Sequence, residues 1–305
     1  MERRKFLKKS ALGALFASVA APTITKAASK KNDHISITLL HTGDTHSRIE
    51  AFPKNSADYP NEGGYAARAA LVEKIRQDHE NVLLFDSGDI VQGTPYFNFY
   101  KGELEMKLMS KMHYDAANLG NHEFDNGLEG IRNMLQYAEF PFICSNYDFS
   151  ETILKDRFQP YKVFERQGVK IGVFGLGVEL DGMVWDKNYG KTKYLDPIKV
   201  SQKMVKELRQ DKGCDLVVCL SHLGYKYDGP KMDDVKVAQA VSGLDIILGG
   251  HSHTFMDAPV YVKNPQGEEV LINHSGWSGV RIGKIQVTFD RKKKKSGING
   301  KNVQL

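Results

Sequence analysis

The stretch Leu39-Leu40-His41-Thr42-Gly43-Asp44-Thr45-His46 joins an apolar run to a polar cluster, and this arrangement is the strongest indication of the fold. Residues Ile37–Leu40 are short, apolar and partly β-branched, which is typical of a buried strand. Asp44 and His46 follow at once, two positions apart. In an open α/β sheet, ligands bind in the crevice outside the carboxyl ends of the strands. We therefore expect both side chains to reach one metal ion from an extended turn.

Four more polar clusters follow apolar runs in the same way. They are Gly88-Asp89 after Val82–Phe85, Gly120-Asn121-His122-Glu123, Ser221-His222, and Gly249-Gly250-His251-Ser252-His253 after Ile246–Leu248. A lone Gly-Asp is usually a turn, and a lone His after a strand is usually structural. Five such clusters, each after a predicted strand, indicate one shared site instead. Carboxylate and amide oxygens combined with imidazole nitrogens suit Mn, Fe or Zn.

These clusters predict a centre with two divalent ions, in which Asp89 bridges the ions. Asn121 offers a neutral oxygen, while His222, His251 and His253 supply imidazoles from two further strand ends. Two ions about 3.5–4 Å apart generate hydroxide near neutral pH and hold the attacking and leaving oxygens of a phosphoryl transfer.

The segment Asn121-His122-Glu123-Phe124-Asp125 supplies what metal ions do not. A phosphoester leaving group departs as an alkoxide unless it is protonated, and a His held by a carboxylate is a suitable general acid. We assign the catalytic roles to His122 and Asp125.

Helical and strand-like segments alternate over most of the chain, which indicates βαβ units and an α/β fold. Amphipathic periodicity predicts helices at Gly64–Glu80, Glu103–Met112, Gly127–Ala138 and Pro197–Lys212. Further strands are predicted at Ile35–Leu40, Ala116–Leu119, Pro141–Cys144, Val169–Leu176 and Leu216–Leu220. The runs Val260–Val262, Val270–Ile272 and Ile282–Phe289 have only short turns between them. We expect an antiparallel portion to close the domain.

Residues 1–28 have the composition of a targeting segment. Paired arginines in Met1–Lys8 precede the short, weakly apolar stretch Ala11–Ala21, a pattern of twin-arginine export signals. The apolar run is too short for a spanning helix, and a small-residue cleavage site lies between Ala27 and Ser29. This predicts a periplasmic or secreted protein without a stable membrane anchor. An ordinary basic N-terminus and a plain secretory signal are the alternatives.

The charge does not favour nucleic-acid binding. The chain is formally +5, but residues 1–28 contain six Lys or Arg and one Glu, so the chain from Ser29 is neutral. We predict one catalytic domain over 29–290, about 260 residues long, and a basic flexible tail over 291–305. Three cysteines, Cys144, Cys214 and Cys219, are an odd number with poor spacing for a bridge, so we expect free buried thiols.

The motif set resembles the catalytic domain of the 5′-nucleotidase branch of calcineurin-like metallophosphoesterases. The resemblance rests on Leu39–His46, Gly63-Gly64 with Ala67-Arg68, Gly88-Asp89 with Gln92-Gly93-Thr94-Pro95, Gly120–Gly127, Ser221–Gly224 and Gly250–His253. It implies a four-layer α/β/β/α sandwich with a dinuclear centre. One metal would take Asp44, His46, Asp89 and His253, and the other would take Asp89, Asn121, His222 and His251. His122 and Asp125 match the catalytic dyad of the family.

The implied activity is an exported phosphomonoesterase of 5′-nucleotidase type that uses a metal-bridging hydroxide on a phosphoester, foremost a nucleotide. A 2′,3′-cyclic phosphodiesterase, a thiosulfate-ester hydrolase and a noncatalytic metal-binding subunit are the alternatives. Relatives that act on nucleotides carry a second, C-terminal domain for the base, so we also expect that a separate chain could supply it. His253 stands at a position that is Gln in some relatives.

Two aromatic features are open to more than one interpretation. Trp277 and His274 match a loop that lies near the metals in relatives, yet packing is their default role. The cluster Tyr96, Phe97, Phe99 and Tyr100 is interpreted first as core, with an exposed docking patch for a partner domain as the alternative.

Overall fold

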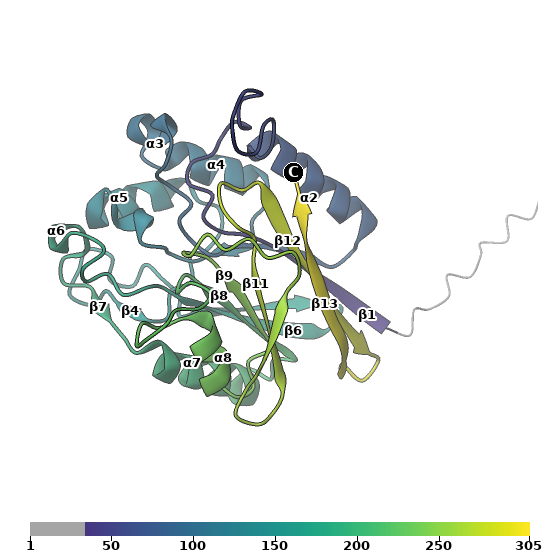
Figure 1. Ribbon diagram of the computed structural model, residues 1–305. Helices are drawn as coiled ribbons and strands as arrows, with labels where there is room; N and C mark the ends of the chain where they lie inside the picture. Colours follow the sequence, from purple (N-terminus) through teal and green to yellow (C-terminus); the bar gives the residue numbers. More distant parts are fainter. Residues whose placement is uncertain (1–33) are drawn as a thin grey trace, which may run out of the picture. The chain divides into compact units, whose positions relative to one another are not determined.

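Two facing sheets form the middle of the molecule in a computed structural model that describes residues 34–305 (Figure 1). The first sheet has the strand order β13-β12-β1-β2-β3 and the second β10-β11-β9-β8-β6-β5. The first comprises β1 (His34–Thr42), β2 (Val82–Asp86), β3 (Ala116–Ala117), β12 (Arg281–Asp290) and β13 (Lys295–Gln304). The second comprises β5 (Tyr161–Arg166), β6 (Val169–Leu176), β8 (Leu216–Ser221), β9 (Ile246–Gly249), β10 (Val260–Lys263) and β11 (Glu269–His274). A small ribbon pairs β4 (Tyr147–Asp148) with β7 (Lys193–Tyr194).

Helices cover the outer face of each sheet, so the described residues form four layers. The helices are α2 (Tyr65–Asp78), α3 (Pro95–Tyr100), α4 (Glu103–Lys111), α5 (Gly127–Met134), α6 (Asp186–Tyr189), α7 (Pro197–Lys206) and α8 (Asp234–Ala240). Short 3₁₀ turns occupy His122–Phe124 and Leu135–Tyr137, and a π-helical turn, Glu207–Asp211, extends α7. The predicted α/β/β/α sandwich is confirmed.

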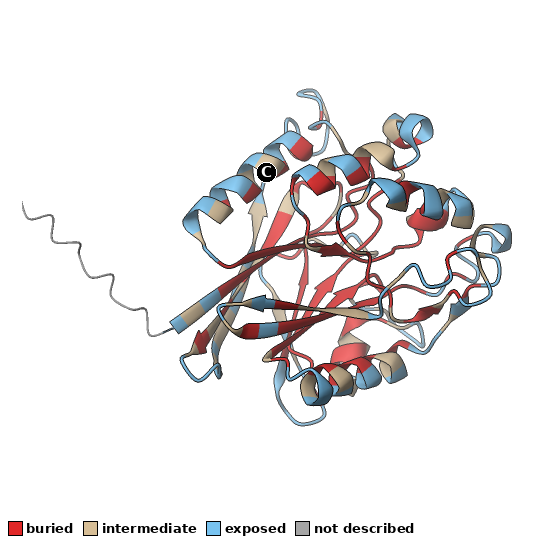
Figure 2. Ribbon diagram, turned by 180° about the vertical axis from the view of Figure 1, so that it is seen from behind, coloured by how far each residue is buried: buried red, intermediate tan, exposed pale blue. Residues whose placement is uncertain are grey.

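Three apolar clusters hold the layers together, and β1 shows how one strand serves two of them. Leu39 lies in the cluster between the sheets, while Leu40 lies in the cluster under α2, α4 and α5. Successive side chains of a strand point to opposite faces, so a strand buried on both sides must be apolar at consecutive positions. A third cluster packs the second sheet against α7 and α8. Figure 2 shows the central strands buried along most of their length and the helices buried on one side.

The prediction of a flexible tail is wrong for residues 295–304, because these residues form β13. This strand pairs antiparallel with β12 from Arg281 opposite Gln304 to Phe289 opposite Lys295. Ile298 packs against the cluster between the sheets, and Leu305 packs against the cluster under α2. The composition suggested a solvated end, but pairing satisfies backbone groups of β12 that an open edge would leave to water.

Other strand predictions need smaller corrections. Pro141–Cys144 is not a regular strand, since Phe142 and Ile143 make only isolated bridges. The closing portion is antiparallel at β10–β11 and β12–β13, but β11 runs parallel to β9. Cys144, Cys214 and Cys219 are free and buried, as expected.

The export prediction stays a prediction, since the segment 1–28 and the cleavage site before Ser29 lie outside the described residues. Within residues 34–305, no helix combines the length and apolar character needed to cross a membrane.

Candidate metal centre

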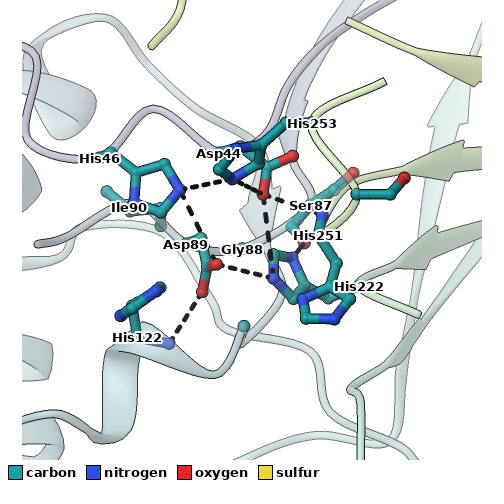
Figure 3. A network of polar contacts seen from close by, with 12 residues as sticks. Asp44, His46, Ser87, Gly88, Asp89, Ile90, His122, His222, His251 and His253 are labelled. Carbon is teal, nitrogen blue, oxygen red and sulfur yellow. Dashed lines mark hydrogen bonds and ion pairs between the residues drawn. The ribbon is translucent and has the colours of Figure 1, made fainter. Parts of the chain in front are cut away.

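The polar clusters named above meet at the carboxyl ends of β1, β2, β3, β8 and β9 (Figure 3). Three groups have ligand atoms within 4.8 Å of one another: Asp44 with His46 and His253, His46 with Asp89 and His122, and Asp89 with His222 and His251. His46 and Asp89 each belong to two of these groups, and Asp89 links the group of His46 to the group of His222 and His251. A carboxylate has two oxygens, so Asp89 is the one of the two that suits a shared ligand. The structure therefore brings together six of the seven proposed ligands by direct proximity of their donor atoms.

The seventh proposed ligand, Asn121, begins the 3₁₀ turn that carries His122. Its Oδ1 atom is buried and has no hydrogen-bond partner among the described residues. A buried acceptor without a partner is costly, so such a group calls for an explanation. A cation beside Oδ1 would provide that partner.

Most of the proposed ligands have a strained backbone. Five of the seven have a positive φ angle, between 48° and 75°, which is uncommon for residues other than glycine. They are Asp44, His46, Asp89, His251 and His253. Such residues cost on the order of 1–3 kcal/mol each and occur most often at functional sites. The loops are therefore held in shapes that direct their side chains inward at the expense of local stability.

Distances between the charged groups are short. His222 Nε2 lies 3.0 Å from Asp89 Oδ2 and 3.9 Å from Asp44 Oδ1, while His253 Nε2 lies 3.8 Å from Asp44 Oδ1. His46 Nε2 and His253 Nε2 are 3.0 Å apart. A side chain on Gly120 would collide with Asp89 and would place a carbon 2.7 Å from His222 Nε2, so only glycine fits there.

The protonation of these histidines suits a cation. Burial lowers the pKa of His46 to about 4 and that of His251 to about 3, so both imidazoles are neutral near pH 7. Burial alone would also lower the pKa of His222, but the charges of Asp89 and Asp44 raise it to about 10. A single proton on His222 offsets only one of the two converging carboxylates, whereas a divalent ion would offset both.

The orientation of the His222 ring supports the same conclusion. Its Nδ1 lies 2.8 Å from the carbonyl oxygen of Ser87, so Nδ1–H can donate and leave Nε2 to face the carboxylates. Metal-binding histidines usually donate their second nitrogen to such a partner. The donor set, its burial and its orientation therefore fit a divalent metal.

The proposed catalytic pair lies beside this cluster. His122 Nδ1 is 2.9 Å from Asp125 Oδ2, and the backbone N–H of His122 donates to Asp89 Oδ1 over 2.8 Å. Burial opposes a charge on His122, but the hydrogen bond to Asp125 and the charge of Asp89 raise its pKa above the ordinary value. Both side chains are about one-third exposed, so solvent or a substrate can reach them.

Glu123 has a role that the sequence did not assign, and Trp277 lies beside a proposed ligand, as the alternative to its packing role expected. The buried carboxylate of Glu123 accepts hydrogen bonds from the backbone N–H groups of Asp89, Ile90 and Gly120. Trp277 stacks on His253, with ring centroids 6.0 Å apart and planes at 29°. In the sequence, Glu123 is marked only as an acidic residue inside a polar motif, and Trp277 only as an aromatic residue in a loop. Neither feature identifies the residue that it contacts.

The remaining aromatic predictions divide. His274 is buried and forms a hydrogen bond with Asp234, so its role is structural, as the default interpretation expected. Phe97 is buried, but Phe99 is 80% exposed and Tyr100 is also exposed, so the core interpretation is wrong for these two.

Comparison with known proteins accords with this geometry. Residues 37–255 match the family model described as calcineurin-like phosphoesterase. The chain belongs to the calcineurin-like phosphoesterase family. It is 32% identical over 290 residues to a snake venom 5′-nucleotidase from Naja atra, covering 88% of this chain and 53% of that protein. It is 35% identical over 277 residues to a 5′-nucleotidase from Vibrio cholerae, covering 86% and 49%.

A solved structure supports the fold as well. The 5′-nucleotidase precursor from Thermus thermophilus superposes with a TM-score of 0.78 at 34% identity, covering 89% of this chain and 55% of that one. The chain thus spans about half the length of the curated relatives it matches. Within the phosphoesterase family, its similarity is to 5′-nucleotidases.

Proposed function

We propose that this protein is an exported, dinuclear-metal phosphomonoesterase of 5′-nucleotidase type. The observation that carries the proposal is the convergence of six metal-type donors beside the His122–Asp125 pair, together with the buried, unpartnered Oδ1 of Asn121. Membership of the phosphoesterase family and similarity to 5′-nucleotidases support the same reaction class.

The donors divide into two sets that share Asp89. Asp44, His46, Asp89 and His253 would hold one ion, and Asp89, Asn121, His222 and His251 would hold the other. Mn, Zn and Fe all suit this mixture of oxygen and nitrogen donors. When bound, two such ions lower the pKa of water and neutralise charge on phosphoryl oxygens.

The chain itself supplies the proton for the leaving group. Asp125 orients the imidazole through Nδ1, so Nε2 of His122 is the nitrogen that faces a substrate. The raised pKa of His122 keeps more of this imidazole protonated near neutral pH, as a general acid requires. His122 then donates its proton to the oxygen that leaves phosphorus.

The decisive experiment combines metal analysis with activity. We expect purified protein to bind two divalent ions per chain, and Asp89→Ala to lose most metal and most phosphatase activity because both ions share this carboxylate. The exposed Asp257 provides a matched control, Asp257→Ala, that keeps both. Fewer than about one ion per active chain, or full activity in Asp89→Ala, contradicts the dinuclear proposal.

A substrate panel separates the rival activities. AMP, a 2′,3′-cyclic nucleotide and a thiosulfate ester, each incubated with metal-loaded protein, distinguish the monoesterase from the two alternative hydrolases. If the protein binds two metal ions but hydrolyses none of the three substrates, the alternative of a noncatalytic metal-binding subunit is favoured. A nucleotidase-type domain on a separate chain stays a prediction, tested by adding such a domain and measuring kcat/KM for AMP and glycerol phosphate.

Export also stays a proposal that rests on Arg3 and Arg4. Changing both to Lys should trap the precursor in the cytoplasm. Normal periplasmic accumulation of the double variant would refute the twin-arginine route.

A further inference from the structure

A cavity of about 390 Å³ lies beside the proposed catalytic pair. It is lined by Asp125 together with Met183, Val184, Trp185, Lys187 and Asn188. Its volume lies within the range of small-molecule sites, about 300–1,000 Å³. Because Asp125 holds His122 through Nδ1, the cavity adjoins the catalytic pair on its Asp125 side.

The lining contains two large apolar side chains that the fold leaves in solvent. Trp185 is 71% exposed and Met183 is 40% exposed. A single exposed apolar residue needs no explanation, but here two of them share one cavity with a member of the catalytic pair. Indole offers a flat aromatic face and a thioether offers a polarisable sulfur, and both favour contact with aromatic rings.

Polar contacts hold the segment 185–188, which lines the cavity, in place. Asn188 Nδ2 donates to the backbone carbonyl of Asp125 over 3.0 Å, which ties α6 to the loop that precedes α5. Lys187 Nζ lies over the indole ring of Trp185, 4.4 Å from its centroid, and this cation–π contact orients the ring. Figure 1 shows α6 next to α5, and the two helices are in contact. The exposed indole is thus anchored beside the site.

We propose that this cavity is a subsite for the leaving alcohol of the phosphoester, and that Trp185 stacks on the heteroaromatic base of a nucleoside. The inference rests on the proposed phosphomonoesterase function and assigns to it a specificity-determining residue. It places a base contact within the described catalytic unit, in addition to any that another domain supplies.

The test compares AMP with ribose 5-phosphate, which carries the same phosphorylated ribose without a base. Base–aromatic stacking is strong enough that alanine substitution of the aromatic residue lowers affinity about 5- to 150-fold. We expect Trp185→Ala to lower kcat/KM for AMP by that factor and to leave ribose 5-phosphate within about twofold. Tyr261→Ala removes an exposed aromatic on β10 and is the matched control, with the ratio of the two substrates unchanged.

A binding measurement makes the test independent of turnover. The chain has two tryptophans, so Trp277→Phe leaves Trp185 as the single tryptophan, whose emission is selected by excitation at its long-wavelength edge. Adenosine added to this variant should quench the emission with saturation, and tryptophan at 71% exposure is open to such contact. Asn188→Ala should weaken the quenching, because it releases α6 from Asp125.

The outcomes separate failure of the subsite from failure of the proposed function. If AMP and ribose 5-phosphate are hydrolysed at the same kcat/KM, or if Trp185→Ala leaves their ratio unchanged, the subsite is refuted while the phosphatase stands. If neither is hydrolysed, the proposed function fails and the adenosine titration alone decides the subsite. A selective loss in Phe99→Ala, with none in Trp185→Ala, would place base binding beside α3 and overturn the inference.

Discussion

The Glu123 carboxylate holds the loop of Asp89 through hydrogen bonds to the backbone of that loop. Glu123 Oε2 accepts a hydrogen bond from the backbone N–H of Asp89 over 3.0 Å, and Oε1 accepts one from Ile90 over 2.8 Å. Oε2 also accepts from Gly120 over 2.5 Å, so one side chain joins the loops after β2 and β3. Burial and the charge of Asp89 raise the pKa of Glu123 to about 7. We regard Glu123 as a positioning residue for a proposed shared metal ligand.

Glu123→Ala should therefore destabilise the fold and weaken metal binding together. It leaves three buried N–H groups without an acceptor, and each such group costs about 1–3 kcal/mol. We expect a loss of about 3 kcal/mol in the free energy of unfolding by urea titration, with a higher Kd for metal. Glu129→Ala, on the exposed side of α5, should change stability by less than about 0.5 kcal/mol. A stable Glu123→Ala protein with unchanged metal affinity would contradict this role.

His122→Ala should keep its metals and slow hydrolysis of alkyl phosphates by about 10²–10⁴-fold, the range for loss of a general acid. An aryl phosphate with an acidic phenol needs little protonation, so its rate should fall far less. Steady-state kinetics on both esters, with metal content measured in parallel, check this prediction. Equal losses on the two esters would remove His122 from the acid role.

Trp277 should report metal binding at His253. Its ring stacks on the imidazole of His253, and the loop is tied to the site because Ser278 N–H donates to the carbonyl of Asp44 over 2.8 Å. In a Trp185→Phe background, Zn²⁺ added to metal-free protein should change the emission of Trp277. The same titration after His253→Ala should give a smaller change. Constant emission while bound zinc rises would show that this ring does not sense the site.

Removal of β13 should destabilise the domain. A chain ending at Asp290 loses the pairing partner of β12 and the packing of Ile298, so we expect the free energy of unfolding to fall by at least about 2 kcal/mol. Urea denaturation measures the difference. Lys292→Ser with Lys294→Ser removes basic charge from the turn without touching the strand and should stay within about 0.5 kcal/mol of the parent. Equal stability of the truncated and full chains would restore the flexible-tail interpretation.

Much of the fold follows from patterns that are local in the chain. The strand at Val169–Leu176 is predicted and observed with the same limits, because an apolar run broken by a charge only at Lys170 and bounded by turn residues fits a strand of a buried sheet. Residues 295–304 lack such a pattern. Their strand depends on the free edge of β12, which exists only after the sheet has formed.

The features of the site likewise fall into those that local sequence predicts and those that depend on tertiary packing. Sequence alone determined which donors follow which strands, since strand, turn and ligand lie within about ten residues and parallel strands bring their ends to one edge. Only tertiary structure decided that Glu123 holds the Asp89 loop, that Trp277 covers His253, and that Trp185 borders Asp125. Those pairs depend on how separate loops, up to 60 positions apart for Asp125 and Trp185, pack once the layers are assembled. Periodicity records which face of an element is buried, but it does not record which loop that face will meet.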